Sequence, residues 1–111
     1  MSKQPEEYIR HIYLEINYLT AQVDNLDIVK FLKNETQMRA FARSLEIIDE
    51  ASKQVDQEFR KLHPEIEWKE MSGMRDRLIH HYFGVDYEIV WDVVKNEIPK
   101  LKLQIESLLK I

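Results

Sequence analysis

Apolar side chains recur at the spacing of an α-helix along most of the chain, and the interruptions divide it into elements. Residues 4–23 form the first predicted helix, because Pro5 is tolerated in a first helical turn and one face is apolar. That face carries Ile9, Ile12, Tyr13, Ile16, Leu19 and Val23. A short helical element over residues 26–32 leads to the next long helix.

This second long helix is predicted over residues 34–62. Asn34, with Gln37 three residues later, has the pattern of a capping box. The seam that follows repeats about every 3.5 residues, as in a coiled-coil-like antiparallel bundle. It consists of Met38, Phe41, Leu45, Ile48, Ser52, Val55, Phe59 and Leu62. A second stripe of Ala40, Ile47 and Ala51 indicates either burial on two sides within the bundle or a homodimer surface.

Proline and glycine mark where the predicted helices of the second half of the chain start, weaken or end. Pro64 ends the long helix because it lacks the amide that would continue it. A helix over residues 68–83 follows, with Gly84 as its C-terminal cap and Gly73 as a weak point. Asp86 is a good N-cap for residues 87–96, and Pro99 marks the start of a last helix over residues 101–109. The pattern predicts an all-α antiparallel bundle of four to five main helices.

Composition agrees with one helical domain over residues 1–111. The chain has only 2 Gly and 3 Pro, and 32% of its residues are charged. It has no cysteine, which excludes disulfides and thiolate metal sites, and no apolar run approaches a membrane span. We therefore expect a cytoplasmic protein without membrane contact.

The net charge disfavours one kind of nucleic-acid binding, while the local cluster of cations permits another. A net charge of −4 argues against broad wrapping of nucleic acid, which needs many cations. A small site for one or two phosphates needs only a few cationic groups. Between Trp68 and Phe83 the chain supplies Lys69, Arg75, Arg77, His80 and His81.

Arg75 is the residue whose position most needs explanation. On a continuous helix it falls within an apolar arc of Met71, Met74, Leu78, Ile79, Tyr82 and Phe83. A guanidinium is rarely buried without a partner, so Arg75 is either an anion ligand or a salt-bridge partner inside the bundle. Glu46, Asp49 and Glu50 are the candidate partners. Tyr82 is by default a core aromatic with its hydroxyl at the rim.

Arg75 and His80 do not converge on one regular helix. Five residues separate them by about 140° around the axis and about 7.5 Å along it. Two arrangements would bring them together: unwinding of the helix before Gly84, or a two-fold axis that sets two copies of the segment against each other. Asp76 and His80, spaced i,i+4, are predicted to contact each other, so the carboxylate could orient the imidazole.

This set of groups suits cleavage of RNA without a metal. An imidazole can take the proton of a 2′-hydroxyl or protonate the leaving 5′-oxygen, and a guanidinium can stabilise charge on the phosphate oxygens. We expect no metal and no cofactor. Arg77 and His81 are either part of a solvated face or additional contacts to RNA phosphate, and the ring systems of Trp68 and Trp91 are expected to pack in the core.

Several longer segments resemble a known family. They are His-Pro-Glu-Ile-Glu-Trp at residues 63–68, Gly-Met-Arg-Asp-Arg-Leu-Ile-His-His-Tyr-Phe-Gly-Val-Asp at 73–86, Ile-Val-Trp at 89–91, Leu-Glu-Ile-Ile-Asp-Glu-Ala at 45–51 and Asn-Glu-Ile-Pro at 96–99. Together they resemble the HepT-like proteins, the DUF86 branch of the HEPN superfamily. The resemblance covers most of the chain.

The resemblance implies a HEPN-like, homodimeric helical bundle whose Arg-x4-His-x-Tyr motif is Arg75, His80 and Tyr82. Such proteins are typically metal-independent endoribonuclease toxins, paired with a minimal nucleotidyltransferase (MNT) antitoxin. The antitoxin would silence the toxin by adenylylating Tyr82, and Asp76 would assist the site.

The chain also departs from the family pattern at two positions. Asp49 stands where many relatives have glycine, and Glu67 stands where many have proline. Asp49 could alter a close helix contact or add negative charge near the cleft. A competing function is a non-catalytic nucleotide- or substrate-binding subunit of a nucleotidyltransferase complex.

Overall fold

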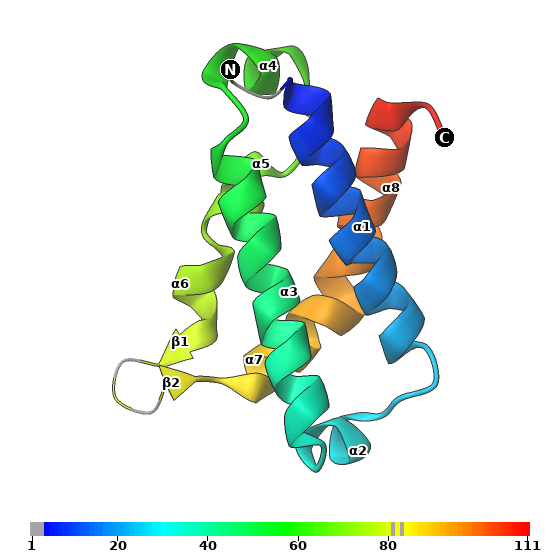
Figure 1. The fold of residues 1–111 in the computed structure, drawn as a ribbon, viewed down its shortest axis with the longest axis vertical. Coiled ribbons are helices and arrows are strands. Elements are labelled where there is room, and N and C mark those ends of the chain that lie inside the picture. Colours follow the sequence, from blue (N-terminus) through cyan, green and yellow to red (C-terminus); the bar gives the residue numbers. More distant parts are fainter. Residues whose placement is uncertain (1–3, 81, 83) are drawn as a thin grey trace.

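The computed structural model describes residues 4–80, 82 and 84–111, and for His80 it describes the backbone. Helices dominate, joined by one small hairpin (Figure 1). The elements are α1 (Pro5–Val23), α2 (Ile28–Leu32), α3 (Glu35–Lys53), α4 (Gln57–Leu62), α5 (Trp68–Ser72), α6 (Met74–Leu78), β1 (Ile79–His80), β2 (Gly84–Val85), α7 (Tyr87–Asp92), a π-helical turn η1 (Val93–Glu97) and α8 (Ile98–Leu109). The all-α bundle predicted from the sequence is confirmed.

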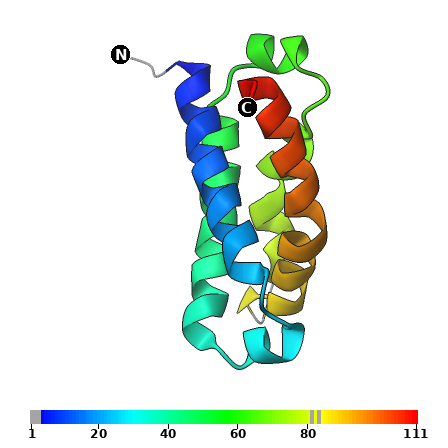
Figure 2. The same ribbon diagram turned by 90° about the vertical axis from the view of Figure 1, so that its right-hand side faces the viewer.

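The core lies between α1, α3 and α8, with the shorter helices closing the remaining side (Figures 1 and 2). The predicted apolar face of α1 is confirmed, since Ile9, Ile12, Ile16 and Leu19 have no exposed surface. The Tyr13 hydroxyl donates a hydrogen bond of 2.7 Å to Glu106 on α8, which raises the pKa of the phenol. None of the helices in the described ranges is long and apolar enough to cross a membrane.

The predicted helix over residues 34–62 is wrong in its length. It starts as expected, because the Asn34 side chain accepts the Gln37 amide at 3.0 Å, but α3 ends at Lys53. Asp56 then caps α4 by accepting the Phe59 amide at 2.8 Å. Ser52 and Val55 are buried and the half-buried Phe59 of α4 still packs against the core, whereas Leu62 is 75% exposed, so the apolar seam passes the break and ends before Leu62. The Ser52 carbonyl at this break accepts the Val55 amide at 3.2 Å and also a hydrogen bond from the Arg60 guanidinium at 2.6 Å.

The predicted helix over residues 68–83 begins at Trp68 as expected, but it is wrong in its continuity and its length. It breaks at Gly73 into α5 and α6, and α6 ends at Leu78. The chain then forms an antiparallel hairpin in which Ile79 pairs with Val85 and His80 with Gly84. Gly84 has a φ of +82°, a left-handed conformation that favours glycine, so it closes a hairpin and does not cap a helix. Phe83 lies outside the described residues.

The end of the chain follows the prediction more closely. Asp86 caps α7 by accepting the amides of Glu88 and Ile89 at 3.1 and 3.2 Å. The two helices expected on either side of Pro99 instead run together through η1. Proline has no amide N–H to donate, and its ring crowds the carbonyl four residues earlier, which here is that of Lys95. The wider π-helical turn of η1 gives room for the ring without breaking the helix. The helical chain therefore continues through Pro99.

Candidate functional site

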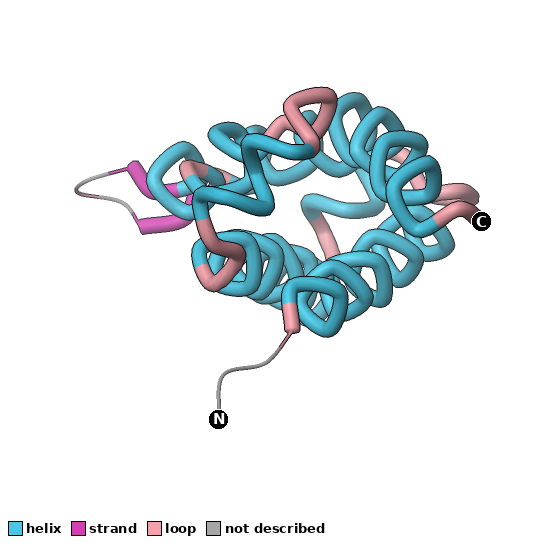
Figure 3. The backbone as a smooth tube through the Cα atoms, turned by 90° about the horizontal axis from the view of Figure 1, so that it is seen from above, coloured by secondary structure: helices cyan, strands magenta, loops and turns pink. Residues whose placement is uncertain are grey.

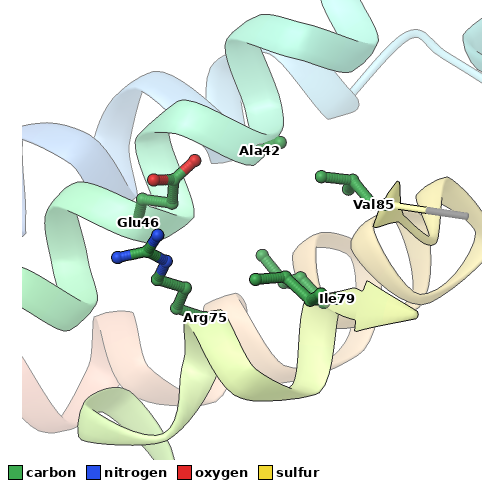
Figure 4. A pocket seen from close by; sticks show the side chains of 7 residues that line it. Ala42, Glu46, Arg75, Ile79 and Val85 are labelled. Carbon is green, nitrogen blue, oxygen red and sulfur yellow. The ribbon is translucent and has the colours of Figure 1, made fainter. Parts of the chain in front are cut away.

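A pocket of about 260 Å³ opens between α3, α6 and the hairpin. Its walls are mostly apolar, with one cationic and one acidic side chain (Figure 4). The lining residues are Ala42, Glu46, Arg75, Leu78, Ile79, Gly84 and Val85. Viewed along the bundle, the hairpin projects from the edge opposite the C-terminus (Figure 3). The pocket thus lies where the hairpin joins the bundle.

Arg75 contributes the cationic group of this pocket. Its side chain is exposed and directed toward the Glu46 carboxylate (Figure 4). Within the described ranges, no ion pair of 4.0 Å or less involves its guanidinium. The apolar arc predicted around it is correct for the buried Met71, Met74 and Leu78, and ends where α6 ends. Arg75 therefore lies at the margin of the core with its charge accessible from the pocket.

Asp49 contacts Arg75 through the backbone and not through the guanidinium. Its Oδ2 atom accepts the backbone amide of Arg75 at 2.8 Å, and the carboxylate is 1% exposed. Asp49 was considered from the sequence as a salt-bridge partner of the Arg75 side chain. The bond to the amide was missed, because its two residues are 26 positions apart and on different helices.

Arg77 of α6 is held by an ion pair to Glu97 of η1. Its two terminal nitrogens donate to both Glu97 oxygens, at 2.8 and 2.5 Å, and this hydrogen bonding raises the pKa of Arg77. Glu97 belongs to η1, so the π turn brings a carboxylate to the outer face of α6. Sequence reasoning missed this pair, because its two residues are 20 positions apart. Pro99, two residues after Glu97, signals an irregular helical turn there but not the partner of Arg77.

The hairpin places the remaining motif residues differently from the sequence-based expectation. His80 lies on β1, so the i,i+4 helical spacing to Asp76 does not apply, and Asp76 is exposed on α6. Tyr82 lies in the turn between the strands and is 90% exposed, so the prediction of a packed core ring is wrong. The reason is the early end of α6, which takes Tyr82 out of the helix whose apolar face would have buried it. His81 lies outside the described residues.

Unwinding before Gly84, one of the two arrangements predicted to bring Arg75 and His80 together, does occur. It starts at Ile79, and Leu78 accepts the Asp86 amide at 2.7 Å across the base of the hairpin. The offset of about 140° therefore no longer applies, since it holds for one continuous helix. Among the residues with assigned positions, no three His, Asp or Glu groups gather as a metal site would require.

The protein is thus an all-helical bundle with an accessible arginine in a pocket beside a short hairpin. Residues 7–108 match the model of a family described as ribonuclease HepT-like. Because this match covers most of the chain, the protein belongs to the HepT-like ribonuclease family. The family expected from the sequence is confirmed.

Individual relatives agree with this assignment. The chain is 45% identical over 108 residues to a protein of Caldanaerobacter subterraneus subsp. tengcongensis named as a candidate RNase, covering 97% of this chain and 96% of the relative. It is 42% identical over 110 residues to a candidate ribonuclease HepT of Thermococcus cleftensis, covering 99% of this chain and 100% of the relative. No solved structure gives a significant match.

Proposed function

We propose that this protein is a metal-independent endoribonuclease and the toxin of a HEPN/MNT toxin-antitoxin system. The family and the relatives named as RNases support RNA as the substrate. The observation that carries the proposal is Arg75, whose guanidinium is exposed at a pocket bordered by the strand of His80. An arginine in that position is suited to bind a phosphodiester.

In the proposed reaction His80 takes the proton of a ribose 2′-hydroxyl. The 2′-oxygen then attacks the adjacent phosphorus, and the bond from phosphorus to the 5′-oxygen breaks. A proton passes to the leaving 5′-oxygen, so the products carry a 2′,3′-cyclic phosphate and a 5′-hydroxyl. Arg75 stabilises the charge that builds on the phosphate oxygens. These steps require no cofactor.

Neighbouring polar residues have secondary roles in this proposal. Asp76, one residue after Arg75 on α6, assists by orienting the reacting groups. Arg77 and His81 contact flanking RNA phosphates, and Arg77 keeps Nε and its outward N–H bonds for this purpose while paired with Glu97. Flanking contacts of this kind raise affinity and make binding dependent on salt concentration.

The proposed activity is tested with purified protein, RNA and excess chelator. Cleavage that leaves 2′,3′-cyclic phosphate ends is expected to persist in EDTA. Cleavage that needs an added divalent cation would contradict the metal-independent reaction. Nucleotide binding without cleavage would instead support the competing function, a non-catalytic binding subunit of a nucleotidyltransferase complex.

We also propose that the protein acts as a homodimer with two such pockets near its axis. Ile79 is 43% exposed beside the pocket, and the half-buried Val85 faces the same opening. Pairing two copies there would cover these apolar side chains and bring several cations together, which favours a bound anion.

Ile79→Asp is therefore expected to shift the protein from dimer to monomer in light scattering at micromolar concentration and to weaken RNA cleavage. Leu103→Asp is the matched control, because Leu103 is 70% exposed on α8, on another side of the bundle. A wild-type protein that is monomeric and fully active would contradict the dimer.

Tyr82 is the proposed site of silencing by the MNT antitoxin. Its side chain is 90% exposed in the hairpin turn, where another enzyme can reach the phenol. An added adenylyl group would bring bulk and negative charge next to the pocket and compete with RNA for Arg75. Modified protein is expected to lose cleavage without unfolding.

Tyr82→Phe keeps the ring but removes the acceptor oxygen. We expect this variant to retain cleavage and to escape silencing when it is co-expressed with the nucleotidyltransferase. Mass spectrometry of the intact protein measures the adduct. Tyr18→Phe is the control, since this partly exposed tyrosine of α1 should leave modification unchanged. An adduct that persists in Tyr82→Phe would show that another residue is the acceptor.

A further inference from the structure

Asp49 is a buried carboxylate to which the proposed reaction assigns no role. It lies on α3, is 1% exposed, and its Oδ2 atom accepts the Arg75 amide at 2.8 Å. Its Oδ1 atom lies 2.8 Å from Nζ of the half-exposed Lys53, without the angles of a hydrogen bond. Burying a carboxylate is costly unless its oxygens accept hydrogen bonds or pair with a cation. The hydrogen bond from the Arg75 amide is the one with good geometry that the Asp49 side chain accepts within the described residues.

The start of α6 explains why an acceptor is needed there. The first amides of a helix lack partners within the helix, and a side chain at the N-cap position usually accepts one of them. In α6 the N-cap residue is Gly73, which has no side chain. Asp49 supplies the missing acceptor from the neighbouring helix.

The capped amide belongs to the residue whose guanidinium lines the pocket. Fixing the backbone of Arg75 fixes the point from which its long side chain extends toward Glu46 and the hairpin. At the other end of α6 the Arg77–Glu97 ion pair provides a second anchor. Without the Asp49 contact, α6 would be held only by the Arg77–Glu97 ion pair near its end. Its first turn would then move more freely, and the Arg75 guanidinium would sample more positions.

We propose that Asp49 is a positioning residue, which holds Arg75 in its catalytic orientation by capping α6 from α3. This inference rests on the proposed ribonuclease function. It concerns orientation and not charge, so a neutral acceptor of the same shape should serve equally well. An asparagine has that shape and an amide oxygen that can accept the same bond.

The test compares Asp49→Ala with Asp49→Asn at a temperature well below the melting transition of each. We expect Asp49→Ala to lower kcat by about 10-fold or more with KM changed by less than about 2-fold, because a misplaced catalytic group impairs the transition state more than binding. Asp49→Asn is expected to stay within about 3-fold of wild type in kcat.

A matched control removes a similar cap elsewhere. Asp56 accepts the Phe59 amide at 2.8 Å at the start of α4, at the end of the molecule away from the hairpin (Figure 1). Asp56→Ala should lower the melting temperature without changing kcat. If Asp49→Ala also lowers only the melting temperature, or if Asp49→Asn is as inactive as Asp49→Ala, the positioning role is wrong.

Amide hydrogen exchange separates this proposal from the proposed function. The Arg75 amide should be protected in wild type and Asp49→Asn and exchange at least about 10-fold faster in Asp49→Ala, whatever the reaction. Protection that is unchanged in Asp49→Ala would overturn the cap itself. If protection changes as expected but RNA is not cleaved by wild type, the ribonuclease function fails and the cap stands.

Discussion

Arg75→Ala is expected to lower kcat for RNA cleavage by about 10²–10³-fold, the usual loss on removing one group that stabilises transition-state charge. The guanidinium lines the pocket and, within the described part of the chain, has no ion-pair partner at 4.0 Å or less. Its removal should therefore leave the bundle intact. Cleavage kinetics and far-ultraviolet circular dichroism measure the two effects.

Arg39→Ala is the control for this variant. Arg39 is also exposed and pairs with Glu35 one turn earlier on α3, an interaction of little weight for stability or activity. Activity should stay near wild type there. If Arg75→Ala loses helicity as well as activity, the bundle needs this side chain and the catalytic interpretation is wrong.

His80→Ala is expected to lower cleavage by about 10²–10⁴-fold, the typical contribution of general acid-base catalysis. The residue lies on β1, directly beside the pocket wall formed by Ile79. An imidazole titrates near neutral pH, so the wild-type rate should change with pH in that range. The remaining activity of the variant should lose this dependence.

His11→Ala provides the comparison, because His11 is exposed on α1 and lines a different pocket between α1 and α3. This variant should keep both the rate and its pH profile. A pH profile that is unchanged in His80→Ala would assign the proton transfer to another group and leave the histidine without a catalytic role.

Local interactions are what the sequence determined well. The apolar face of α1 follows directly from its spacing, because a helix repeats every 3.6 residues and its buried face must be apolar. Asn34 and Asp86 were identified as caps, since each acts on amides two or three residues away. The family resemblance was likewise read from continuous segments, and it was confirmed.

Helix ends were the main error, and the reason is physical. The apolar repeat continues through Ser52, Val55 and Phe59, so periodicity alone cannot show that the chain breaks at residues 54–56. Asp56 and Gly73 carried the signal for both breaks. The end of α6 at Leu78 is fixed by two contacts: Ile79 pairs with Val85 in the hairpin, and the Leu78 carbonyl accepts the Asp86 amide. The spacing of apolar residues along a helix cannot predict either contact.

The geometry around Arg75 was decided by tertiary structure. The sequence pointed to this residue because a charge interrupted an apolar arc, but the continuous helix behind that argument does not exist. Its backbone is fixed by Asp49, 26 residues earlier, and the neighbouring Arg77 by Glu97, 20 residues later. Such contacts depend on how α3, α6 and η1 pack together. The sequence supplied the reactive groups, and packing between distant segments determined where they lie.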